Sequence, residues 1–130
     1  MERTLDIDQL IGPMGGEEGI KALVDHFYDA MDSIPEVQTI RKMHPHLEVA
    51  RERLFDFLVF RFGGDQRYLE KRGHPRMRAR HFPFAIGPRE RDQWLYCMDL
   101  ALKKMNYDQD LQDLLFLFFT DFAEKMRNRD

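Results

Sequence analysis

Apolar residues recur at intervals of three and four in the first half of the chain, the spacing that places one apolar stripe on a helix. In the stretch Glu17 to Asp32 the stripe is Ile20, Leu23, Val24, Phe27, Tyr28 and Met31. In the stretch Pro45 to Phe62 it is Leu47, Ala50, Leu54, Phe57 and Leu58, widened by Phe55, Val59 and Phe62. The pattern predicts two amphipathic helices, the first preceded by Gly15-Gly16 and the second ended by Gly63-Gly64.

The second half of the chain predicts two more helices. One opens at Gly87-Pro88 and carries Trp94, Leu95, Met98, Ala101, Leu102 and Met105 at helical spacing. The other runs from the N-cap Asp108 to Arg127, with Leu111, Leu114, Leu115, Phe118, Phe122 and Met126 on its inner face. No segment has the period of a strand, so the fold class is all-α. We expect one domain over residues 1–130, with residues 1–14 as an N-terminal extension or short helix.

Composition narrows the possible partners and compartment. The formal net charge of -3 argues against general nucleic-acid binding, which depends on Lys and Arg. Cys97 is the only cysteine, so no intrachain disulfide forms, and a reducing compartment fits. The N-terminus lacks the cationic and apolar regions of a signal peptide, and the longest apolar run, Leu114 to Phe119, is too short to span a bilayer. We therefore expect a cytoplasmic protein without a membrane or nucleic-acid partner.

The broken stretch between the helix pairs is strongly basic. From Lys71 to Arg89 there is no acidic residue, while Arg76, Arg78 and Arg80 lie beside apolar residues such as Phe84. A solvated charge run would have acids interspersed. An anionic ligand with an apolar body explains the pattern better, because arginine binds carboxylates at the rim of an apolar pocket. Haem has this character, with two propionates and a need for an axial ligand such as histidine.

Histidines and polar-tipped aromatics supply the candidate chemistry. Tyr28 and Trp94 fall on inward stripes, where each either bonds a backbone carbonyl or contributes to a polar pocket. His81 follows Met77 by four residues, so a short helix over 76–82 puts both on one face. A lone histidine here is more often a satisfied core or surface residue than a ligand. The pair His44 and His46 lacks the further ligands that a zinc site needs, and Cys97 is best interpreted as a packed thiol.

Several motifs together resemble one protein family. They are GG at Gly15-Gly16, FY at Phe27-Tyr28, MHP at Met43 to Pro45, RL-x-x-FL from Arg53 to Leu58, GG at Gly63-Gly64, and RGHPRMRARHFPFAIGPRERDQWLYCM from Arg72 to Met98. The sequence resembles the group II truncated haemoglobins over roughly Gly15 to Phe122. The resemblance implies a truncated globin-like two-over-two helical sandwich around haem b.

The same resemblance assigns roles to individual residues. It makes His81 the proximal iron ligand and Arg80, followed by Arg78, the partner of the haem propionates. The distal ligand-binding residues that it implies are Tyr28, His44, Trp94, Leu54, Ala50 and Phe27. The other haem contacts that it implies are Met77, Phe84, Ile86, Phe57 and Leu58.

The function that follows from the resemblance is reversible binding of dioxygen, CO or NO. Tyr28, Trp94 and His44 are possible hydrogen-bond donors to the ligand, which suits oxygen scavenging, sensing, or detoxification of NO or peroxide. One alternative is a haem enzyme, a peroxidase or nitric oxide dioxygenase with a separate reductase; another is a cofactor-free interaction domain. The sequence leaves open whether the chain is a monomer or homodimer, and whether His44 coordinates ferric iron.

Overall fold

The computed structural model describes residues 5–130, which form helices and no strand. The four long helices are α1 (Gly16–Ser33), α3 (Leu47–Arg61), α6 (Pro88–Lys104) and α7 (Gln109–Met126). The short ones are α2 (Gln38–Lys42), α4 (Arg67–Arg72) and α5 (Met77–His81), with 3₁₀ turns η1 (Ile7–Gln9) and η2 (Pro35–Val37). The all-α prediction is confirmed, and the predicted ends of the long helices agree to within two residues.

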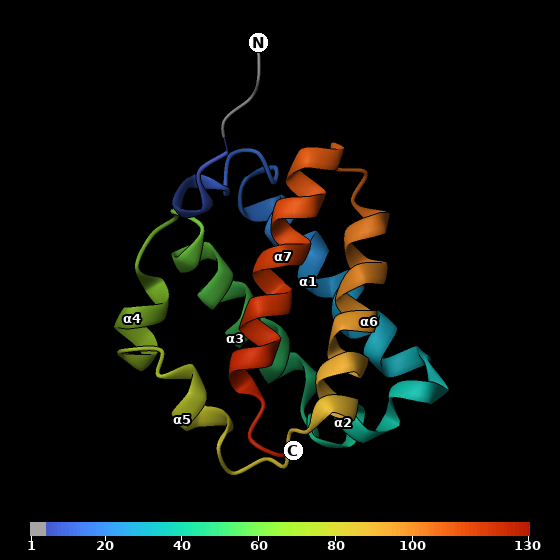
Figure 1. Ribbon diagram of the computed structural model, residues 1–130. Helices are drawn as coiled ribbons and strands as arrows, with labels where there is room; N and C mark the ends of the chain where they lie inside the picture. Colours follow the sequence, from blue (N-terminus) through green and yellow to red (C-terminus); the bar gives the residue numbers. More distant parts are fainter. Residues whose placement is uncertain (1–4) are drawn as a thin grey trace.

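The long helices pack as two pairs. The main contacts join α1 to α3, α6 to α7, and α1 to α6 across the layers. Figure 1 shows α7 in front of α1, with α3 and α6 on either side and α4 and α5 along one edge. This is the expected two-over-two arrangement.

The core is rich in aromatic rings. Phe27, Phe62 and Phe119 are almost completely buried, and the Phe62 ring lies 5.1 Å from that of Phe118. Phe119 therefore belongs to the core. Phe116 is 38% exposed on the outer face of α7, so the two rings have different environments.

Local signals explain most helix ends. Asp108 caps α7, since its carboxylate accepts a hydrogen bond from the Leu111 amide at 3.0 Å. Gly63 ends α3 with φ of +99°, and a Cβ atom there would collide with the Asp8 carbonyl. The second long helix starts at Leu47 rather than Pro45, because His46 has non-helical angles (φ -124°, ψ 88°).

The segment 65–86 is more ordered than its composition suggests. Helix α4 is anchored by Tyr68, which is 3% exposed, and by Asp56 on α3. The Asp56 carboxylate is 2% exposed and accepts hydrogen bonds from Lys71 and Arg72, both at 2.9 Å. This buried ion cluster ties α4 to α3.

The start of the chain packs onto this framework. The predicted extension 1–14 contains the η1 turn, and Leu10 and Met14 are buried in the core; residues 1–4 of it lie outside the described part. In the described residues no helix is long and apolar enough to cross a membrane.

Candidate functional site

A cavity of about 570 Å³ opens between α3, α5 and α6, a size that suits a small organic ligand. Most of the predicted site residues line it: Tyr28, His44, Ala50, Leu54, Phe57, Met77, Arg80, His81, Phe84, Ile86 and Trp94. Segments far apart in the sequence are thus brought together around one space.

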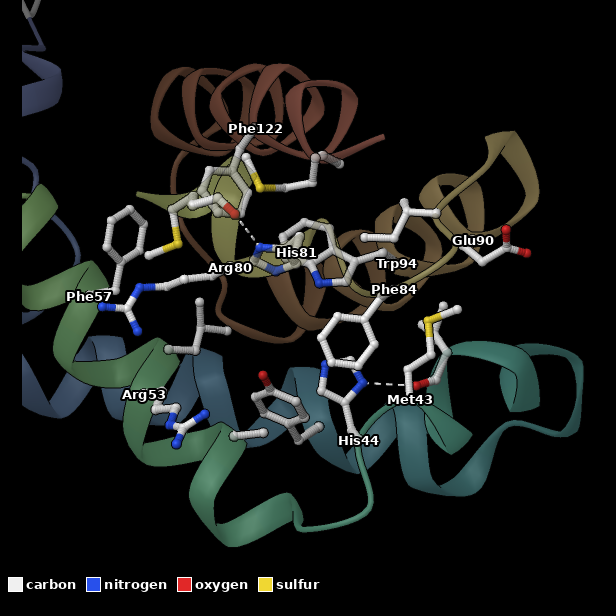
Figure 2. A pocket seen from close by; sticks show the side chains of 18 of the residues that line it. Met43, His44, Arg53, Phe57, Arg80, His81, Phe84, Glu90, Trp94 and Phe122 are labelled. Atoms are coloured by element: carbon white, nitrogen blue, oxygen red, sulfur yellow. Dashed lines mark hydrogen bonds between the residues drawn. The ribbon is translucent and has the colours of Figure 1, made fainter. Parts of the chain in front are cut away.

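His81 enters this cavity from the last turn of α5. Its Nδ1 atom lies 2.6 Å from the Met77 carbonyl oxygen, one helical turn earlier. A carbonyl only accepts, so Nδ1 carries the proton and Nε2 of the neutral ring presents a lone pair. Figure 2 shows the ring between the side chains of Arg80 and Trp94. This is the arrangement of a histidine oriented for metal ligation.

Tyr28 projects from α1 into the same space. Its side chain is 5% exposed, and burial raises the pKa of the phenol, so the hydroxyl stays protonated. Among residues 5–130 the hydroxyl has no hydrogen-bond partner. Every fully buried side-chain nitrogen or oxygen in that range does have one, so the Tyr28 hydroxyl is reached from the cavity.

Trp94 is a second donor. Its ring packs 4.9 Å from Phe27 and 5.8 Å from Phe119, measured between centroids, which fixes the indole against the core. The indole N–H has no partner within the described part of the chain, and the residue lines the cavity. The interpretation of Tyr28 and Trp94 as a polar pocket is therefore favoured over separate bonds to backbone carbonyls.

His44 occupies the opposite wall from His81 (Figure 2). Its Nδ1 lies 2.8 Å from the Ile40 carbonyl, and its ring meets Tyr28 edge to face at 5.9 Å. Burial lowers the pKa of His44, and the positive charge of Arg41 adds to this; together they outweigh the hydrogen bond to the Ile40 carbonyl, which raises it. The neutral ring therefore presents Nε2 as an acceptor, whereas the sequence had suggested a donor.

The arginines at the cavity differ in their bonding. Arg80 lines the cavity, but its guanidinium donates to the carbonyls of Pro75 (2.6 Å) and Arg72 (2.9 Å). Arg78 is exposed and lies outside the lining. Arg53 lines the cavity and makes no ion pair or hydrogen bond with residues 5–130. Sequence reasoning missed Arg53, although it stands three residues after Ala50 and so shares its helix face.

Two residues that were predicted to line the site are instead buried beneath the cavity wall. Phe27 and Leu58 are fully buried and do not line it. Phe27 instead packs its ring against Tyr28 at 4.8 Å and so holds that donor in place. Besides Arg53, the lining residues that sequence reasoning did not assign are Met43, Pro45, His46, Val49, Tyr68, Glu90, Arg91, Phe122, Ala123, Met126 and Ile40. Phe122 and Met126 could have been found from the sequence, because both lie on the predicted inner face of the last helix.

Comparison with known proteins gives a consistent answer. Residues 10–128 match the bacterial-like globin family. The group 2 truncated hemoglobin YjbI of Bacillus subtilis (strain 168) is 38% identical over 101 residues, 78% of this chain and 75% of that protein. A cold-adapted truncated hemoglobin from the Antarctic marine bacterium Pseudoalteromonas haloplanktis TAC125 has a TM-score of 0.90 at 35% identity, covering 94% of this chain and 99% of the other.

A second solved structure agrees over the whole length. The group II 2-on-2 hemoglobin from the plant pathogen Agrobacterium tumefaciens has a TM-score of 0.90 at 34% identity, covering 100% of both chains. The chain accordingly belongs to the group II truncated haemoglobins of the bacterial-like globin family.

Proposed function

We propose that this globin holds haem b through His81 and reversibly binds dioxygen, and also CO or NO, in a polar distal pocket. The observation that carries the proposal is the pair of unpartnered donors, Tyr28 and Trp94, that share one cavity with the oriented ring of His81. The Tyr28 hydroxyl faces an apolar cavity without a protein partner, so a ligand that accepts its hydrogen bond would be stabilised there.

The residues of the cavity fit haem. Leu54, Phe57 and Ile86 provide apolar surface for the macrocycle, and the Nε2 atom of His81 is available to bind the iron. Arg53 is the cation best placed for a propionate, because its guanidinium is not already bonded. When bound, the haem would supply an iron that can bind a small gas molecule.

The two hydrogen-bond donors would then determine the rate at which the bound gas dissociates. Tyr28 O–H and Trp94 N–H each offer a hydrogen bond worth about 1 kcal/mol, which slows release about fivefold. A pocket with two such donors favours tight holding over rapid delivery. We infer a role in oxygen scavenging or sensing, or in detoxification of NO or peroxide.

The rate of dioxygen release tests this proposal. In stopped-flow measurements we expect Tyr28→Phe and Trp94→Phe each to speed release about fivefold, since each removes one donor and keeps an aromatic ring. The matched control is Tyr107→Phe, because the Tyr107 hydroxyl bonds the Met14 carbonyl at 3.0 Å and lies outside the cavity. Release rates that stay unchanged in both pocket variants would contradict the donor role.

Peroxide reduction is a second candidate, and His44 is the observation that favours it. With Nδ1 bonded to Ile40, its Nε2 lone pair is free to take a proton from hydrogen peroxide, the task of a general base. The electrons would come from a separate reductase.

A further inference from the structure

The end of the chain folds back onto the loop that follows His81. Asn128 lies just beyond α7, and Figure 1 shows the C-terminal end beside the segment between α5 and α6. Its side-chain Nδ2 donates to the carbonyl of His81 (3.2 Å) and to that of Phe84 (2.9 Å). Its Oδ1 accepts from the Ile86 amide at 3.0 Å. One amide side chain therefore spans the whole loop.

Backbone contacts strengthen the same junction. The amides of Asn128 and Arg129 both donate to the Ile86 carbonyl, at 2.8 and 3.0 Å. One residue earlier, Arg127 bonds Glu124 at 3.0 Å, and Glu124 also accepts from Arg91 on α6 at 2.6 Å. The tail is thus held to α6 and α7 and can act as a fixed support.

Helix α5 needs such support. It has only five residues, far fewer than a helix requires for stability on its own. On its N-terminal side, α5 is held by the guanidinium of Arg80, which donates to the carbonyls of Arg72 and Pro75 in the segment before the helix. After it, the His81 carbonyl is an end group without a helical partner, and it accepts from the Phe84 amide (3.0 Å) and from Asn128.

We propose that Asn128 is a positioning residue for His81. By donating to the carbonyls of His81 and Phe84, it fixes the last turn of α5 and hence the direction in which the His81 ring meets the iron. The inference rests on the proposed ligation of haem by His81. It assigns to the C-terminal tail a part in setting the strength of the iron–histidine bond.

The test compares Asn128→Asp and Asn128→Ala with wild type in the haem-loaded protein. Aspartate has the same shape and still accepts from Ile86, but it cannot donate to the two carbonyls. Arg127→Ala is the control, because the Arg127 side chain bonds Glu124 in the same tail and makes no hydrogen bond or ion pair with residues 81–86. The readouts are the iron–histidine stretching frequency of the ferrous protein by resonance Raman and the rate of haem loss to an excess acceptor protein.

We expect a lower and broader iron–histidine band in both Asn128 variants, and haem loss about tenfold faster, because both lose the donations to the carbonyls of His81 and Phe84. Asn128→Ala also loses the bond from the Ile86 amide. Arg127→Ala should keep the wild-type band. Equal bands in wild type and both Asn128 variants would overturn the role of Asn128 while leaving the proposed function intact. A wild-type protein without an iron–histidine band would instead overturn the ligation by His81, and the positioning role with it.

Discussion

At the scale of single residues, the site depends on which polar atoms are already bonded. Both His44 and His81 donate Nδ1–H to the carbonyl four residues earlier, so each neutral ring turns its Nε2 lone pair elsewhere. Tyr28 and Trp94 keep unpartnered donors within residues 5–130. Two acceptors and two donors thus share one apolar space, a combination that supports the proposed binding of a metal and a polar ligand.

The state of His44 predicts a pH dependence for peroxide reduction. Burial lowers the pKa of His44 from its ordinary value of about 6.5, so the ring remains an available base through neutral pH. We expect peroxide turnover, measured with a reducing dye, to be steady above that value. It should fall at more acidic pH as Nε2 takes a proton.

The variant His44→Phe keeps an aromatic ring but has no base. We expect its peroxide turnover to be reduced about a hundredfold, the typical contribution of a general base. The remaining turnover should no longer fall at acidic pH. An equal rate and an equal pH profile in wild type and variant would exclude His44 from the proton transfer.

At the scale of elements, α4 is held by the buried ring of Tyr68 and by the ion cluster of Asp56. Burial alone raises the pKa of Asp56, but hydrogen bonds from Lys71 and Arg72 outweigh it and hold the pKa below its usual range. The cluster also fixes the segment that leads into α5, since Arg72 offers its carbonyl to Arg80. The distal helix α3 is therefore connected to the proximal histidine through one carboxylate.

We expect Asp56→Asn to lower the free energy of unfolding by about 2 kcal/mol at pH 7, as measured by urea titration. A lowered carboxyl pKa stabilises the fold above the unfolded value of about 3.9, and this stability is lost as the pH falls through the folded value. The difference between wild type and variant should therefore shrink below about pH 4. The control Asp121→Asn removes an exposed pair with Lys125 and should cost less than about 0.5 kcal/mol; an equal cost for both would refute the cluster's role.

The elements also show what a sequence can and cannot predict. The long helices were predictable because apolar periodicity and end signals such as Asp108 act locally. Helix α4 was missed because its stability comes from Asp56 and Tyr68, contacts that only the fold creates. Likewise, the bonding of Arg80 to two carbonyls depends on how the loop folds, so no spacing rule separates it from the unbonded Arg53.

At the scale of the whole molecule, the two helix pairs pack together and the cavity lies between them and the short helix α5. Distal groups come from α1 and the start of α3, Trp94 comes from α6, and His81 sits on a short helix supported from both sides. The C-terminal tail closes this arrangement by tying α7 to the loop after α5. The fold thus places the proposed proximal and distal residues on separate elements, which the bonds from Asp56 to Arg72 and from Arg72 to Arg80 connect.

The most direct test of this account is the absorption spectrum of the purified protein, ferrous and with carbon monoxide, for wild type and His81→Ala. We predict a Soret band for wild type, with a five-coordinate ferrous form that binds CO. In His81→Ala this form should be lost, because alanine cannot provide the Nε2 ligand. A wild-type protein that stays colourless with added haemin, or a variant with an unchanged ferrous spectrum, would contradict the central claim that His81 holds haem iron.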